Sequence, residues 1–217
     1  MKRSGLLAAI VFAAACGGAS TTRETSPEPA PSTDAGRERV TATTADTVRG
    51  RRYTAADVRF MQGMIGHHAQ ALEMTVLVPA RTGRRDFLLL SERIAVSQQD
   101  EIARMRRWLL DRGEEAPDPA AGHAHHGAGD HALMPGMLTR EELARLAAAS
   151  GAEFDRLFLE FMIRHHEGAL TMVETLFASP GAGQDSELFQ FATDVEADQR
   201  AEIDRMRRLQ AGPVPGT

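Results

Sequence analysis

The chain contains almost no cysteine, no lysine after its second residue, and few aromatic side chains. Cys16 is the single cysteine, and aromatic residues make up 5% of the 217 residues. A folded domain of this composition must build its core from Leu, Ala, Met and Phe, which suits packed helices. The formal net charge of -5 gives no electrostatic reason to expect nucleic-acid binding.

The N-terminal apolar segment is too short to cross a membrane, which needs about 20 apolar residues. Residues 5–15 are small and apolar and follow two basic residues, a pattern that predicts a signal peptide over residues 1–16. The three alanines before Cys16 resemble a bacterial lipobox, so we expect Cys16 to be lipidated and to anchor a cell-envelope lipoprotein, periplasmic or at the outer surface. The same alanines also fit ordinary cleavage, which would release a soluble secreted protein. Both alternatives predict export.

Residues 17–52 are rich in Gly, Ser, Thr, Pro and charge, and we expect them to form a flexible tether to a domain over residues 53–212. If Cys16 is lipidated, that domain has no thiol for disulfides or metal. A site for a soft metal would then have to use methionine thioether and histidine imidazole.

Helix start and stop signals divide the domain into helices. We expect a helix from Thr54 that ends before Pro79, and a second over residues 85–112. Capping boxes beginning at Thr139 and Ser150 predict a short helix and a long helix that ends near residue 178. The last helix should cover residues 185–210. No segment alternates with the period of a strand, so the fold class is all-α.

The domain is internally duplicated. FMQGMIGHHAQALEM at 60–74 matches FLEFMIRHHEGALTM at 158–172, and QQDEIARMRRW at 98–108 matches QRAEIDRMRRL at 199–209. Two helical hairpins of one pattern predict a four-helix bundle with approximate internal two-fold symmetry. Repeat one covers residues 53–113, a histidine-rich linker covers 114–138, and repeat two covers 139–212.

Each copy carries a His-His pair within a frame of methionines. Neighbouring residues of a helix diverge by about 100°, so one histidine of each pair should point inward and the other should lie at a seam between helices. Glu101 and Glu202 lie on the core stripes of the partner helices, where a carboxylate needs a partner. The simplest partner is a histidine across the hairpin, which the carboxylate could orient for a metal, unless it binds the metal itself.

The linker provides a second candidate metal site, because a Gly-rich segment with His and Met can wrap an ion without prior structure. It could equally be a polar crossover. Thioether and imidazole without thiolate favour copper, Cu(I) preferring Met and Cu(II) preferring His. Zinc more often has three or four His, Cys or carboxylate ligands, and a di-iron centre needs Glu-x-x-His motifs that are lacking here. The possible linker ligands are His123, His125, His126, His131, Met134 and Met137.

On the doubled His-His motif and the QxxEIxxM segments, the chain resembles the bacterial family catalogued as domain of unknown function 305. The resemblance implies a ferritin-like four-helix bundle in an exported protein, with copper association in some members. The copies differ at Met61/Leu159, Gly66/Arg164 and Glu73/Thr171, so equal affinity in the two halves is not expected. The candidate metal ligands of the helices are Met61, Met64, His67, His68, Met74, Glu101, Met105, Met162, His165, His166, Met172, Glu202 and Met206.

Three hypotheses follow for function. The first is an envelope copper-binding lipoprotein that sequesters or transfers copper without catalytic turnover. The second is a helical structural or interaction lipoprotein whose Met and His side chains only pack the core. The third, a metalloenzyme, would need an open coordination position and a substrate pocket, and the sequence has no nucleophile elbow, phosphate loop or haem-attachment motif. The sequence leaves the oligomeric state open.

Overall fold

The computed structural model describes residues 52–119 and 133–212. These ranges contain helices and no strand, which confirms the all-α prediction. The helices are α2 (Ala55–Arg81), α3 (Arg85–Asp111), α5 (Arg140–Ala148), α6 (Gly151–Ala178) and α7 (Ser186–Ala211). The predicted signal peptide with Cys16, nearly all of the predicted tether, and linker residues His123, His125, His126 and His131 lie outside the described residues.

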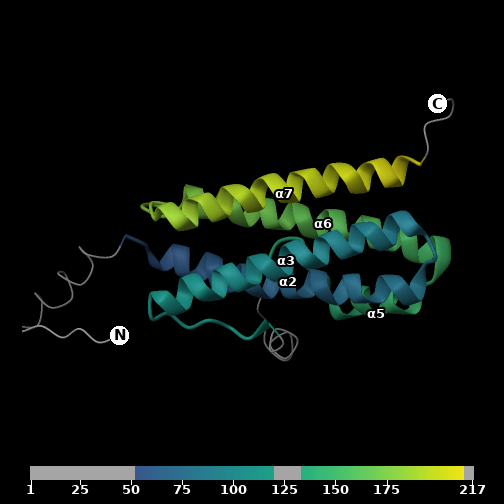
Figure 1. Ribbon diagram of the computed structural model, residues 1–217, viewed down its shortest axis with the longest axis horizontal. Coiled ribbons are helices and arrows are strands. Elements are labelled where there is room, and N and C mark those ends of the chain that lie inside the picture. Colours follow the sequence, from purple (N-terminus) through teal and green to yellow (C-terminus); the bar gives the residue numbers. More distant parts are fainter. Residues whose placement is uncertain (1–51, 120–132, 213–217) are drawn as a thin grey trace, which may run out of the picture. The chain divides into compact units, whose positions relative to one another are not determined.

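Four long helices form a bundle of two antiparallel hairpins, α2 with α3 and α6 with α7 (Figure 1). The hairpins meet mainly through α2 and α6, while α3 and α7 touch only sparsely. The short helix α5 contacts both α2 and α6. In the part of the chain that the structure describes, no helix is both long enough and apolar enough to span a membrane.

Helix α2 begins where the sequence predicts and ends later. The Thr54 hydroxyl accepts the amide of Asp57, and the Asp57 carboxylate accepts the amide of Thr54, so the capping box is formed. The predicted end before Pro79 is wrong, because the helix continues to Arg81. Pro79 is exposed in the last turn, where its missing N–H removes one hydrogen bond, and the amide of Thr82 closes the helix on the carbonyl of Val78.

At the other helix starts, the Thr139 capping box is formed with Glu142, whereas the one predicted at Ser150 is not. Ser150 occupies the N-cap position, but its side chain makes no capping hydrogen bond. The carboxylate of Glu153, which should have completed that box, instead pairs with Arg156 one turn later, at 2.9 Å. An arginine at helical spacing thus competes successfully for the capping carboxylate.

The core consists of two apolar clusters separated by polar residues. Along each long helix, residues of one cluster precede the polar positions and residues of the other follow them. In α2, for example, Met64 belongs to one cluster and Met74 to the other, with two histidines between them. We call the separating residues the polar layer: His67, His68, Gln98, Glu101, His165, His166, Gln199 and Glu202.

Candidate metal centre

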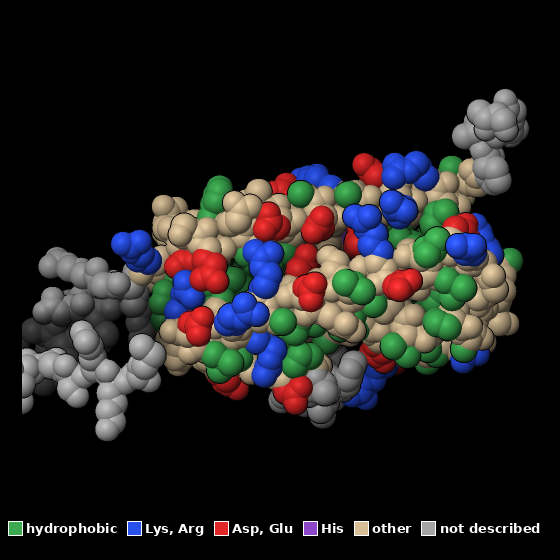
Figure 2. All heavy atoms as spheres, in the orientation of Figure 1, with side chains coloured by type: hydrophobic (Ala, Val, Ile, Leu, Met, Phe, Trp, Pro, Cys, Tyr) green, Lys and Arg blue, Asp and Glu red, His purple; other side chains and the backbone are tan. Residues whose placement is uncertain are grey.

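All eight side chains of the polar layer are buried, and none is more than 5% exposed. Each long helix contributes two of them, so each hairpin contributes four. On the face of the described domain shown in Figure 2, no histidine is visible. Polar groups that are removed from water destabilise the fold unless each has a hydrogen-bond or charge partner. The contacts within the polar layer therefore show which of its atoms remain free to bind a ligand.

The second histidine of each pair is held by a carboxylate from the other helix of its hairpin. His68 contacts Glu101 through Nε2, and His166 contacts Glu202 through Nε2 at 2.7 Å. An ionised carboxylate only accepts, so Nε2 carries the proton in both rings. The remaining Nδ1 of each ring has no hydrogen-bond partner among the described residues, an arrangement also found in metal-binding histidines that a carboxylate orients.

The first histidines of the two pairs stack on each other between the hairpins. The ring centroids of His67 and His165 are 3.9 Å apart with an interplanar angle of 37°. His67 donates from Nε2 to the carbonyl of Pro135 at 3.0 Å, which leaves its Nδ1 unprotonated. The first histidine of each pair thus lies between the hairpins and the second lies at the seam within its own hairpin, and both are buried.

Burial keeps the stacked pair uncharged. Desolvation, with repulsion from His68, lowers the pKa of His67 to about 3. Desolvation, with repulsion from His67, also holds the pKa of His165 well below its usual value. Two neutral imidazoles in contact can each offer a lone pair at neutral pH, and a metal would displace no proton from them.

Five ring nitrogens of the layer are buried without a hydrogen-bond partner among the described residues. They are Nδ1 of all four histidines and, in addition, Nε2 of His165. Gln98 and Gln199 likewise have unpartnered side-chain atoms. Buried polar atoms are normally satisfied, so this concentration of unpartnered atoms makes the polar layer the candidate site.

Methionine thioethers flank the layer on both sides. Met64 and Met105 belong to one apolar cluster, Met162 and Met206 to the other, and all four are fully buried. Each lies four residues from a member of the polar layer on its own helix, which is one helical turn. The other candidate methionines are distributed as follows: Met61 and Met74 are buried in the clusters, Met137 is buried near the linker's end, and Met134 and Met172 are half-buried.

The side chains that usually bind zinc do not converge. Among residues 52–119 and 133–212, no group of three or more His, Cys, Asp or Glu is placed to hold a metal ion. Glu101 and Glu202 each approach one histidine, and the stacked pair brings two imidazoles together. An ion in this layer would therefore need thioether or amide donors in addition to imidazole.

The end of the linker, predicted to be either a metal-binding segment or a polar crossover, contacts the polar layer through the carbonyl of Pro135. Residues 133–138, which we call the crossover strap, cross α2 and α6. The Gln70 side chain of α2 pairs with both the amide and the carbonyl of Leu138, at 2.7 and 3.0 Å. Gly168 of α6 lies directly under the strap, where a Cβ would fall 1.9 Å from the carbonyl oxygen of Pro135.

A difference between the two copies of the duplicated motif could have indicated where this strap packs. Gln70 and Gly168 are equivalent positions of the two copies, and they differ because one anchors the strap while the other makes room for it. The copies also differ at Gly66 and Arg164, and Arg164 holds Glu142 of α5 with two hydrogen bonds of 2.7 Å. Positions where the repeats diverge thus indicate where additional chain packs on the bundle.

Among similar solved structures are proteins from Deinococcus radiodurans and Streptomyces coelicolor. A DUF305 fragment from Deinococcus radiodurans is 31% identical to the chain, with a TM-score of 0.61, over 73% of this chain and 97% of that one. A DUF305 protein of Streptomyces coelicolor that is thought to be secreted is 27% identical, with a TM-score of 0.60, over 75% and 97%.

CopM, solved in Cu(I)-bound and Cu(II)-bound forms, is also similar. The two forms are 25% and 26% identical to the chain, with TM-scores of 0.54 and 0.57, and each covers 71% of this chain and 95% of CopM. No curated protein matches the chain. The sequence profile of the domain of unknown function DUF305 matches residues 57–210. The chain therefore belongs to the DUF305 family.

Proposed function

We propose that this protein binds copper in its polar layer and serves to sequester or transfer it in the cell envelope. The observation that carries the proposal is the set of five unpartnered ring nitrogens in a buried layer flanked by thioethers. CopM, a similar protein, is known in both Cu(I)-bound and Cu(II)-bound forms. The fold is thus compatible with copper in either oxidation state.

The donor set favours Cu(I) over harder ions. Thioether sulfur and neutral imidazole are soft or borderline donors, and Cu(I) accepts low coordination numbers. The stacked pair of His67 and His165 supplies two imidazoles, and Met64 and Met162 lie one turn away on the same helices. These four side chains are the first candidates as copper ligands. His68 and His166 are further candidates through their unpartnered Nδ1 atoms.

Complete burial of the layer favours storage or transfer over catalysis. A catalytic metal needs an open position that a substrate can reach from solvent. The four histidines are at most 1% exposed, so the chain would enclose the ion on all sides. Enclosure also protects Cu(I) from oxidants and from competing ligands.

For location, we propose export followed by lipid anchoring at Cys16. The lipobox-like sequence before Cys16 supports it, as does the relative from Streptomyces coelicolor that is thought to be secreted. Replacing Cys16 by Ser should move the protein from the membrane fraction to the soluble envelope fraction. A Cys16→Ser variant that stays in the membrane fraction would show that the anchor lies elsewhere.

Copper binding is tested by elemental analysis of the protein purified from its native envelope, followed by anaerobic Cu(I) competition titration. The double variant His67→Gln/His165→Gln keeps neutral polar side chains of similar size and should bind Cu(I) at least ~10-fold more weakly. Arg200→Ala, which alters only an exposed ion pair on α7, serves as the control. Absence of copper from the purified protein, with equal affinity in all variants, would favour a purely structural helical module.

A further inference from the structure

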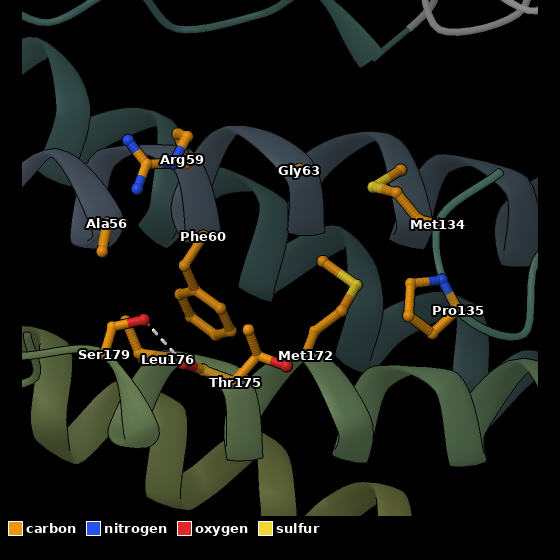
Figure 3. A pocket seen from close by; sticks show the side chains of 10 residues that line it. All are labelled: Ala56, Arg59, Phe60, Gly63, Met134, Pro135, Met172, Thr175, Leu176 and Ser179. Atoms are coloured by element: carbon orange, nitrogen blue, oxygen red, sulfur yellow. Dashed lines mark hydrogen bonds between the residues drawn. The ribbon is translucent and has the colours of Figure 1, made fainter. Parts of the chain in front are cut away.

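A pocket of about 310 Å³ lies between α2 and α6, beside the crossover strap (Figure 3). One wall comes from α2, the opposite wall from α6, and the strap contributes Met134 and Pro135. Unlike the polar layer, this pocket opens to solvent, since both Met134 and Met172 are half-buried. The pocket is therefore a place where an ion could first meet the protein.

Two methionine side chains, one from the strap and one from α6, approach the same glycine in this pocket. A Cβ built on Gly63 would lie 3.3 Å from Sδ of Met134 and 3.4 Å from Cε of Met172. Figure 3 shows the two side chains approaching from the strap and from α6, with Gly63 on the α2 wall. Met172 also packs against one of the apolar clusters, but both side chains are half-buried and line the pocket, so each keeps part of its surface open to it.

The second copy of the motif lacks this space. The residue equivalent to Gly63 is Phe161, which is 2% exposed, and the residue equivalent to Met172 is Met74, which is fully buried. The duplication therefore places a thioether pair with an accessible pocket on one side of the bundle only. This asymmetry indicates a role that the symmetric polar layer does not have.

The strap connects the pocket to the polar layer. Pro135 lines the pocket, and its carbonyl accepts the hydrogen bond from Nε2 of His67. An ion held beside Met134 would thus lie next to the residue that orients a histidine of the buried stack. A small displacement of the strap would release His67 Nε2 and give the ion a path inward.

We infer that Met134 and Met172 form a receiving site for a soft monovalent cation, Cu(I) or its analogue Ag(I), from which the ion passes to the polar layer. This inference rests on the proposed copper function. Neutral sulfur donors suit a soft ion, and the described residues that line the pocket include no carboxylate that would attract a hard one. Arg59, at the far end of the pocket in Figure 3, disfavours a divalent cation more than a monovalent one.

The test measures how fast the full-length protein takes Cu(I) from a chromophoric chelator under anaerobic conditions. Met134→Leu/Met172→Leu keeps the volume of the side chains and removes both sulfurs, and it should load at least ~10-fold more slowly. Thr175→Val, which changes the lining of the same pocket without touching a sulfur, should load at the wild-type rate. Equal loading rates in the wild type and the double Leu variant would overturn the inference.

Gly63→Ala provides a second variant that keeps both sulfurs. Its Cβ would crowd the two thioethers, and their flexible ends would have to move apart, so loading should again slow while the thermal midpoint is unchanged or raised. Unchanged loading in Gly63→Ala would contradict a site at this point.

The variant His67→Gln/His165→Gln separates this inference from the proposed function. It should retain fast binding of Ag(I) at the pocket while losing the tightly held ion of the polar layer. A double histidine variant that loses the fast phase as well would overturn a separate receiving site. A wild-type protein that binds neither Cu(I) nor Ag(I) would overturn both proposals. If instead every methionine variant binds Cu(I) tightly and loads as fast as the wild type, only the receiving site is overturned.

Discussion

His67 and His68 are adjacent in the chain and have different surroundings. His68 faces a carboxylate of its own hairpin, whereas His67 stacks on His165 and contacts only a backbone carbonyl. Lacking a negative partner, His67 stays neutral in the fold, with its pKa lowered to about 3 by burial and by repulsion from His68. The two members of one motif thus supply one oriented and one uncharged imidazole.

The uncharged pair predicts a loss of stability in acid. The unfolded chain protonates His67 and His165 near their usual pKa of about 6.5, while the metal-free fold does not until the pH is much lower. Between about pH 6.5 and 3 the unfolded state therefore binds one more proton at His67, so the free energy of unfolding falls by about 1.4 kcal/mol for each pH unit of acidification. His165 adds to this slope below about pH 6.5, because its pKa is also lowered in the fold. Urea unfolding of the metal-free protein at about pH 6 and 4.5 measures this slope.

His165→Gln is the matched variant for that slope. Neither ring nitrogen of His165 has a hydrogen-bond partner in the described part of the chain, so the replacement breaks no hydrogen bond seen there and removes one titrating group. The slope of unfolding free energy against pH should decrease by the contribution of one proton, about 1.4 kcal/mol per pH unit. An identical slope in wild type and variant would mean that His165 titrates normally in the folded protein.

The buried carboxylates should contribute strongly to stability. Replacing Glu202 by Ala leaves Nε2 of His166 without its partner in the core, and breaking such a buried pair costs about 3–5 kcal/mol. Glu196→Ala on the same helix breaks the exposed pair with Arg200 and should cost at most about 1 kcal/mol. Chemical denaturation of both variants compares them, and equal losses would show that the His166–Glu202 contact adds nothing.

At the scale of elements, the crossover strap depends on two glycines. Gly136 adopts a φ of 75°, which L side chains rarely adopt, and it passes close to Gly168 of α6. Both the clamp by Gln70 and the contact to His67 require this close approach. The strap is therefore part of the site and more than a connection between repeats.

Two helical glycines should respond oppositely to alanine. Gly168→Ala places a Cβ in the backbone of Pro135, so the strap must lift, and the amide of Leu138 should lose its protection from hydrogen exchange. Gly66→Ala meets only Cε of Met134 at 3.7 Å, an ordinary contact, and should gain up to about 1 kcal/mol from helix propensity. Retained protection of Leu138 in Gly168→Ala would show that the strap does not need this contact.

Most helix positions and their pairing into hairpins could be predicted from the sequence, because they depend on local signals. The Thr54 and Thr139 capping boxes and the duplicated motif identify the hairpins, and the apolar period identifies their inner faces. The contact of His67 with His165 could not be predicted, since it depends on how two hairpins dock. The position of Met134 beside Met172 depends on the path of the strap, which no periodic pattern records.

At the scale of the whole molecule, the polar layer divides one bundle into two apolar clusters. The four long helices converge on this layer, so a ligand there would link both hairpins and both clusters. A ligand that binds only the folded state stabilises it by RT ln(1 + [L]/Kd), about 2.7 kcal/mol when the free ligand is at 100 times Kd. Cu(I) should therefore raise the thermal midpoint of the whole domain in one transition.

Thermal unfolding with and without Cu(I), followed by circular dichroism under anaerobic conditions, measures that effect. The variant His67→Gln/His165→Gln should show a much smaller rise, and Arg200→Ala should behave as the wild type. A rise of equal size in the histidine variant would place the stabilising ion outside the polar layer.

The central claim is that copper is held by imidazole and thioether in the polar layer. X-ray absorption at the copper edge, recorded on the Cu(I)-loaded full-length chain, tests it most directly. We predict both nitrogen and sulfur neighbours, with the nitrogen contribution lost in His67→Gln/His165→Gln and kept when His123, His125, His126 and His131 of the linker are replaced. A nitrogen contribution that survives in the core variant, or that disappears with the linker histidines, would contradict the account.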